Sequence, residues 1–246
     1  MAAIPDAVRT LERDLRSLFG DRLKSMLAYG VSAHAAARTD AHGAHGDAHN
    51  LVHTLVVVDT IGEDDLRACA ARAKAWHDRS LATPLIVGAG ELARSLDVFP
   101  LEFAAIQADH VIVVGPNPFA GTAIDPADVR RACEVQARSH LLHLREGYIE
   151  TLGNGDALAV LIVQSAPAFA ALLQSVARLQ SGDRPDATAA GRQVERLLET
   201  PGGSITQVVR LAGVTEISAT EAQRVFPAYL DVVQRLVAYI DAWSGR

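Results

Sequence analysis

The strongest constraint on the fold of this chain is a change in hydrophobic pattern near residue 125. Before it, short apolar runs typical of buried strands alternate with stretches whose apolar residues recur every three or four positions, as in amphipathic helices. After it, only the helical spacing continues. We therefore predict an α/β (α+β) domain, a mixed sheet with flanking helices, over residues 1–124, and an all-α helical bundle over residues 125–246.

The first half has the pattern of a sheet interrupted by one insertion. Candidate strands lie at Leu23–Val31, Leu51–Val58, Pro84–Val87 and His110–Val114. One candidate helix ends near Gly20, and a second spans Glu63–Arg79. Residues 32–50 contain almost no large apolar side chains and are rich in Ala, His, Gly and Asp. We interpret them as a flexible insertion between the first two strands.

The second half has clear helix signals. Asp125 followed by Pro126 combines a favourable N-cap with proline at the first helical position, and predicts a long helix ending near Leu152. Further helices are expected over about 156–180, with a kink at Pro167, and over about 187–199, 204–212 and 219–243.

Composition narrows the classes of function. A formal net charge of -6 gives no general attraction to DNA or RNA. The N-terminal residues lack the unbroken apolar stretch of a signal peptide, and the longest later apolar run, Ala157–Val163, is too short to cross a membrane. Cys69 and Cys133 lack CxxC spacing and fit buried thiols in a reducing compartment. These features predict a cytoplasmic protein with no membrane partner.

Several motifs resemble the nucleotidyltransferase superfamily with the DNA polymerase β-like fold. Leu27–Ala33 resembles its strand-to-helix turn, where a hydrophobic residue precedes Gly-Ser, and Leu55–Val58 resembles the strand that carries its metal-binding carboxylates. Ser95–Phe103 and His110–Gly115, followed by the long helix, resemble bacterial predicted nucleotidyltransferases with a C-terminal helical domain. The resemblance implies this fold, nucleotide binding and Mg²⁺ as the cofactor of an active enzyme.

The residues that would carry this chemistry are altered. Mg²⁺ requires oxygen ligands, and the superfamily supplies two acids two residues apart, on one face at the start of the second strand. The matching positions here are Leu51 and His53. In the turn, the residue after Gly30 is Val31, whereas the superfamily has a serine there that contacts phosphate. Ser32 can take the place of that serine only if the turn is shifted by one residue. We expect degraded transfer chemistry, with Gly30 and Ser32 as nucleotide-binding residues.

An active enzyme would need carboxylates from elsewhere. Asp47 and His49 have the required spacing, Asp40 lies in the same stretch, and Asp59 follows the second strand, which makes Asp47 and Asp59 the catalytic candidates. Holding a metal in a glycine-rich segment costs a large conformational entropy. Asp59 also fits a solvated strand end, which is the interpretation that we favour.

Histidines are concentrated in and just after the insertion. Five of the chain's nine histidines fall there: His34, His42, His45, His49 and His53. Imidazole suits zinc, nickel or copper better than magnesium, so one interpretation is a transition-metal site with His49 and His53 as ligands. Gly43 and Gly46 argue against a helix that would align these rings, and a solvated loop is the favoured alternative.

Charged residues elsewhere leave two interpretations open. Arg130, Glu134 and Arg138 share one side of the long predicted helix, because steps of four residues return to the same face. Arg130 and Arg138 either contact nucleotide phosphate or form ion pairs along the helix. Asp97 and Glu102, around an expected turn at Phe99-Pro100, either line a cleft near the altered site or cap a helix.

Three functions remain open from the sequence. The favoured one is a nucleotidyltransferase-like protein with degraded metal-binding acids that retains nucleotide or ligand binding between its domains. The second is an active, Mg²⁺-dependent transferase that moves a nucleoside monophosphate to a small molecule or protein. The third is a non-enzymatic module whose helical half forms a homodimer or docks a partner.

Overall fold

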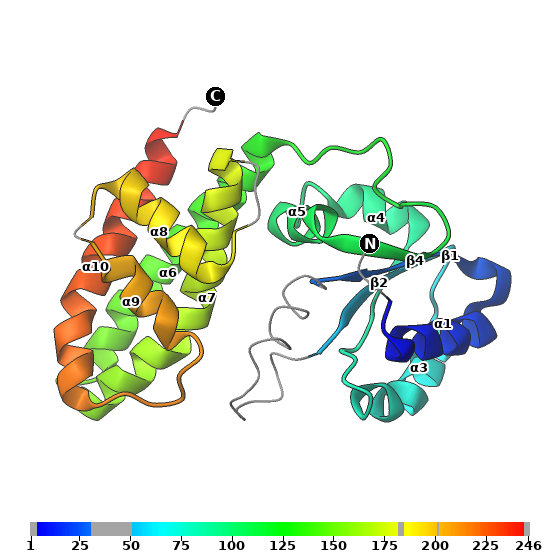
Figure 1. The fold of residues 1–246 in the computed structure, drawn as a ribbon, viewed down its shortest axis with the longest axis horizontal. Helices are drawn as coiled ribbons and strands as arrows, with labels where there is room; N and C mark the ends of the chain where they lie inside the picture. The colour runs from blue at the N-terminus through cyan, green and yellow to red at the C-terminus, as the bar shows by residue number, and fades with distance from the viewer. Residues whose placement is uncertain (1–3, 31–50, 182–184, 201, 244–246) are drawn as a thin grey trace. The chain divides into compact units, whose positions relative to one another are not determined.

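The chain forms a sheet-containing unit followed by a helical one. The computed structural model describes residues 4–30, 51–181, 185–200 and 202–243. Clustering of contacts gives two compact units, Met1–Ile124 and Asp125–Arg246. A four-stranded mixed sheet with helices makes up the first unit and helices alone make up the second (Figure 1), which confirms the predicted fold class.

The sheet is built around β1 (Leu23–Tyr29). This strand pairs antiparallel with both β2 (His53–Val58) and β4 (His110–Val114), while β3 (Leu85–Gly88) pairs parallel with β2. The strand order is therefore β3-β2-β1-β4. Because side chains alternate between the two faces of a strand, the nearly continuous apolar runs of β1 and β2 require cover on both faces.

Helices supply that cover. One face packs against α1 (Asp6–Phe19), which continues into the 3₁₀ turn η1 (Gly20–Arg22), and against α3 (Glu63–His77) (Figure 1). The core on this face includes Val8, Leu11, Leu15, Met26, Val56 and Trp76. On the other face, α4 (Ala89–Ser95) and α5 (Pro100–Ala108) contribute Leu92, Phe103 and Ile106 to a second core with Leu27 and Leu55.

The expected turn at Phe99-Pro100 is present at residues 96–99, but it joins two helices, α4 and α5, that the sequence had not predicted. Phe99 is the N-cap of α5 and Pro100 occupies its first turn, where the missing N–H of proline costs nothing. Both helices are short, at 7 and 9 residues. Segments of this length span about two turns, which is too short for apolar residues to recur at helical spacing often enough to predict a helix.

The second unit is organised around α7 (Gly155–Ser181). This helix contacts α6 (Pro126–Glu150), α8 (Ala187–Leu198), α9 (Ser204–Leu211) and α10 (Ala219–Ala242). By length and composition alone α7 would suffice to cross a membrane, which the short run of unbroken apolar residues had not indicated. Its packing against four helices, with residues such as Ile162, Phe169 and Leu173 fully buried, identifies α7 as a core helix.

Side-chain caps set the starts of the helices in this unit. The Asp125 carboxylate accepts a hydrogen bond from the Ala127 N–H at 2.8 Å, which confirms the predicted N-cap of α6. Asp186 and Ser218 cap α8 and α10 in the same way, at 2.7 Å and 3.2 Å. The α7 helix continues through Pro167.

Gly115 generates a testable prediction about the sheet. It follows β4 with φ of +73°, and a Cβ atom there would overlap the carbonyl oxygen of Lys24 on β1. We expect Gly115→Ala to lower the free energy of unfolding by more than the roughly 1–2 kcal/mol that a left-handed backbone costs a non-glycine residue, because β4 must also move away from β1.

Gly121 provides the matched control. It has a similar φ of +75°, but nothing lies within 4 Å of its added Cβ atom. Gly121→Ala should therefore show the backbone cost alone. Urea unfolding of both full-length variants, followed by circular dichroism, measures the difference, and equal losses at the two positions would contradict this account.

Candidate functional site

Three aromatic side chains lie in a row at one end of the sheet, beside the turn at Gly30. β1 ends at Tyr29, whose cross-strand partners are His53 at the start of β2 and His110 at the start of β4. Directly paired residues of antiparallel strands project to the same face. His53, Tyr29 and His110, called the aromatic row below, therefore share the face that α4 and α5 cover.

Two members of the aromatic row, Tyr29 and His53, have pKa values shifted towards their neutral forms. The rings of Tyr29 and His53 lie 5.5 Å apart, centroid to centroid, at an interplanar angle of 32°. Burial raises the pKa of the Tyr29 phenol, and the carboxylate of Glu102 on α5 raises it further. Burial lowers the pKa of His53, which favours the neutral imidazole. Glu102 thus lies near this end of the sheet.

Backbone contacts fix the turn and the third ring. Gly30 has φ of +68°, and its N–H donates to the carbonyl oxygen of Asp109 at 3.2 Å, which ties the end of β1 to the start of β4. The Nδ1 atom of His110 lies 3.1 Å from the carbonyl oxygens of Ile106 and Gln107, so this nitrogen carries the proton and donates. His53 is the exposed member of the row.

Asp59, a predicted catalytic residue, lies at the opposite end of the sheet. β2 runs from His53 to Val58, so about 20 Å of extended strand separates Asp59 from His53. The Asp59 carboxylate pairs with the Lys24 ammonium at 2.7 Å, and its N–H donates to the Arg22 carbonyl at 2.9 Å. The structure does not bring Asp59 to Gly30, which agrees with the solvated strand-end interpretation.

The two positions that the sequence analysis aligned with metal-binding acids lie at and just before the start of β2. Leu51 is half-buried and His53 is exposed at the positions aligned with the superfamily's acids. Within the ranges that the structure describes, no group of three or more His, Cys, Asp or Glu side chains is placed to hold a metal ion. Asp47, His49 and Ser32 lie outside those ranges, so a catalytic, metal-binding or phosphate-binding role for them stays a prediction.

Arg130 and Arg138 of α6 are both engaged by carboxylates. Arg138 Nη2 contacts the Asp241 carboxylate oxygens of α10 at 2.6 and 2.7 Å, and its Nε contacts Glu134 at 3.3 Å. Arg130 Nη1 contacts Glu134 at 3.0 Å and the Ile240 carbonyl at 3.4 Å. These contacts correspond to the ion-pair interpretation, extended across α6 and α10. Phosphate binding by either arginine would compete with them.

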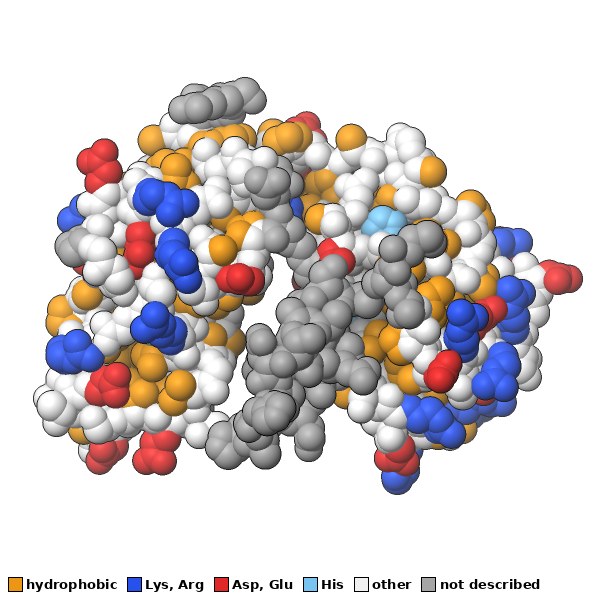
Figure 2. Space-filling view, viewed as in Figure 1, with side chains coloured by type: hydrophobic (Ala, Val, Ile, Leu, Met, Phe, Trp, Pro, Cys, Tyr) orange, Lys and Arg blue, Asp and Glu red, His pale blue; other side chains and the backbone are white. Residues whose placement is uncertain are grey.

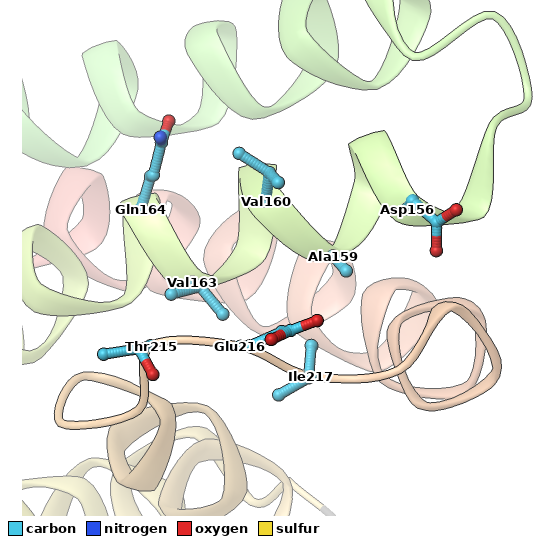
Figure 3. Close-up of a pocket in the computed structure, with 8 residues that line it drawn as sticks. All are labelled: Asp156, Ala159, Val160, Val163, Gln164, Thr215, Glu216 and Ile217. Carbon is cyan, nitrogen blue, oxygen red and sulfur yellow. The ribbon is translucent and has the colours of Figure 1, made fainter.

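The helical unit also has an open pocket of about 310 Å³ between α7 and the segment that joins α9 to α10 (Figure 3). It is lined by Asp156, Ala159, Val160, Val163, Gln164, Thr215, Glu216 and Ile217. The charged groups of this lining are the carboxylates of Asp156 and Glu216. They would repel a triphosphate, so this pocket is not a candidate nucleotide site.

A partly buried polar network joins three helices of the same unit. His140 Nε2 on α6 lies 2.7 Å from the Tyr229 hydroxyl on α10, which donates to Ser165 Oγ on α7 at 3.2 Å. Because the Tyr229 proton is used in that bond, His140 Nε2 donates to Tyr229. The His140 ring also stacks on Phe169 at 5.5 Å. Burial, with a smaller effect of His143, lowers the pKa of His140 to about 4.

Surface charge agrees with the expectation from composition. On the face seen in Figure 2, acidic side chains lie among the basic ones on each unit. Such mixing, with a net charge of -6, gives a polyanion no uniformly positive surface on that face. The absence of general nucleic-acid binding stays a prediction.

The fold defines the class of protein that this chain resembles: nucleotidyltransferases with an N-terminal mixed sheet and a C-terminal helical region. The structure is similar to that of spectinomycin adenyltransferase AAD(9) from Enterococcus faecialis, solved with ATP and spectinomycin. The TM-score is 0.56 at 12% sequence identity, over 94% of this chain and 98% of that chain. No family model and no curated protein matches the sequence. The fold that the sequence motifs implied is thus confirmed.

The His140 network predicts a pH-dependent stability. The His140 pKa of about 4 in the fold compares with about 6.5 in an unfolded chain, so the unfolded state takes up the proton first as the pH falls. The stability that the neutral His140 contributes to the fold is fully present above about pH 6.5. As the pH falls towards 4, the free energy of unfolding decreases by up to about 3 kcal/mol. His140→Gln keeps a donor for Tyr229 but cannot titrate, so its free energy of unfolding should fall less over this window.

Urea unfolding of the full chain at about pH 7 and about pH 4.5 measures this difference. Identical pH dependence of the unsubstituted chain and His140→Gln would show that His140 does not cause the effect.

Proposed function

We propose that this chain is a nucleotidyltransferase-like protein that binds a nucleotide but has lost efficient Mg²⁺-dependent nucleotidyl transfer. The observation that carries the proposal is the identity of two residues, Leu51 and His53, at the head of the strand beside Gly30. The fold supports nucleotide binding, since the similar adenyltransferase was solved with ATP. The replaced acids argue against transfer.

The loss follows from ligand chemistry. Mg²⁺ is a hard cation that binds carboxylate and water oxygens and bridges the phosphates of a nucleotide. Leucine offers no ligand atom, and an imidazole nitrogen is a poor ligand for this ion. A triphosphate at this turn would have to be held without a metal bridge, through N–H and hydroxyl donors. His53 and Tyr29 are described residues with such donors beside Gly30, and Ser32 belongs to the same proposed turn.

Cytoplasmic location is part of the proposal. Cys69 and Cys133 are both free and buried, one in each unit. Burial raises the pKa of both thiols, that of Cys133 to about 12, so neither carries the thiolate that disulfide exchange requires. Buried, protonated thiols of this kind fit a protein of a reducing compartment.

Calorimetric titration with ATP tests the proposal directly. We expect weak binding whose Kd changes by less than about twofold between Mg²⁺ and EDTA, because Leu51 and His53 supply no carboxylate to couple the metal to the site. His53→Ala should weaken this binding, whereas Asp59→Ala, at the far end of β2, should not. Tight binding that requires Mg²⁺ would favour an active transferase, and the lack of any ATP binding would refute the nucleotide-binding proposal.

If acids are placed at these two positions, we expect the opposite result, ATP binding that depends on Mg²⁺. Leu51→Asp/His53→Asp places two carboxylates two residues apart on one face of the strand. We expect its ATP affinity to become Mg²⁺-dependent, by about tenfold or more, in the same titration. The matched control is Leu51→Asn/His53→Asn, which has the same shape without the charge. An Asp variant that responds to Mg²⁺ no more than the Asn variant would show that these positions do not face the nucleotide.

A further inference from the structure

α6 has a second apolar face directed away from the bundle. Val135, Leu142 and Ile149 are 64%, 61% and 71% exposed. They are spaced by seven residues, so they lie within about 40° of one another around the helix. The buried residues of α6 are on the opposite side and include Val129, Cys133, Ala137 and Leu144. The bundle therefore uses one apolar face of α6 and leaves the other, called the α6 stripe, exposed.

The residue just beyond α6 adds a second observation. Leu152 is 90% exposed and has φ of +51°. A left-handed backbone costs a residue with a Cβ atom about 1–2 kcal/mol, and glycine or asparagine is the usual occupant of such positions. An exposed leucine gains nothing within its own subunit that offsets this cost. A partner that covers the α6 stripe and Leu152 would supply the missing apolar contact.

Charges on either side of the α6 stripe indicate which partner fits. At 100° per residue, Glu146 lies along one edge, the acidic edge, and Arg145 lies along the other, the basic edge. Asp128 and Arg138 lie on the same two edges but are already paired, with Arg131 and with Asp241. A twofold axis parallel to α6 would bring the acidic edge of one copy against the basic edge of a second copy, whereas antiparallel pairing would bring like edges together. Glu146 and Arg145 are at nearly the same height, so each would face the other residue across the axis.

We propose that the α6 stripe is the interface of a homodimer in which two α6 helices lie side by side in the same direction. The stripe pairs with its own copy, Leu142 against Leu142, flanked by two Glu146–Arg145 pairs. α6 is 25 residues long, or about 37 Å at about 1.5 Å per residue. One helix face of that length is smaller than the roughly 800 Å² per partner of a standard interface, so the dimer should dissociate in the micromolar range.

Sedimentation velocity of the full chain, from about 1 to about 200 μM and without nucleotide, tests the proposal. We expect a concentration-dependent dimer whose Kd rises at least tenfold in Leu142→Glu, with an unchanged circular dichroism spectrum because Leu142 is exposed. Leu66→Glu is the control: this leucine is 55% exposed on α3 and should not affect the dimer. A monomer at all concentrations, or a dimer unaffected by Leu142→Glu, would overturn the proposal.

A charge swap tests the orientation of the two helices. Glu146→Arg and Arg145→Glu should each weaken the dimer, since each places like charges across the axis. The double variant Glu146→Arg/Arg145→Glu restores unlike pairs and should recover most of the affinity. If both single variants weaken the dimer and the double variant weakens it further, parallel pairing is wrong. Because the assay contains no nucleotide, its result does not depend on the proposed nucleotide binding.

Discussion

The antiparallel pairing of β1 with both β2 and β4 is the interaction on which the first unit depends. It places Tyr29 opposite His53 on one side and His110 on the other. A slip of one residue in either pair would send a ring to the opposite face of the sheet. At the other end of β1, Gly115 approaches the Lys24 carbonyl so closely that a side chain has no room, which holds β4 in this register. The composition of the site beside Gly30 is therefore a consequence of strand register.

The direction of β2 separates two acids of the first unit, Asp59 and Asp65, from the turn at Gly30. At the end of β2 remote from Gly30, Arg22 makes two hydrogen bonds to the Asp65 carboxylate, at 2.8 and 2.9 Å. Asp65 also accepts the N–H of Gly62 at the start of α3, and these contacts lower its pKa to about 2. Together with the Lys24–Asp59 pair, they hold the strand end and the helix start. These acids have structural partners and lie too far from Gly30 to act together with residues at the start of β2.

Sequence patterns predicted those parts of the fold in which the signal is local. The cap and proline at Asp125-Pro126 and the apolar run His110–Val114 each specify an element through neighbouring residues, and both elements are present. α4 and α5 were missed because a helix of about two turns has no room for a repeat. The aromatic row was missed for another reason. Tyr29 and His110 are far apart in the chain, and only strand pairing brings them together.

Whether a property of a site residue could be predicted also depended on whether its signal is local or long-range in the sequence. The proposal that Leu51 and His53 occupy the positions of the superfamily's acids comes from the sequence, because the spacing within a motif suggests that alignment. The position of Asp59 could be predicted in the same way, because Asp59 follows the end of the second strand that is remote from the insertion. For Arg130 and Arg138 the sequence left two interpretations open, because their contact with α10 involves Ile240 and Asp241, about a hundred residues away. Helical spacing predicted Glu134 as a neighbour but gave no indication of the second helix.

α6 shows how one helix can serve two separate purposes. The helix is held to the bundle by the buried Cys133 and the His140–Tyr229 hydrogen bond on its inner side, and by the Arg138–Asp241 ion pair at its edge. These contacts do not involve Leu142, so the α6 stripe adds nothing to the packing of the bundle. Leaving apolar area in water forgoes about 25 cal/mol per Å² that burial would provide. A soluble helix that needed only its inner face would be expected to carry polar residues there, as α3 does with Asp64 and Arg67, and the apolar α6 stripe is therefore better explained by association than by folding.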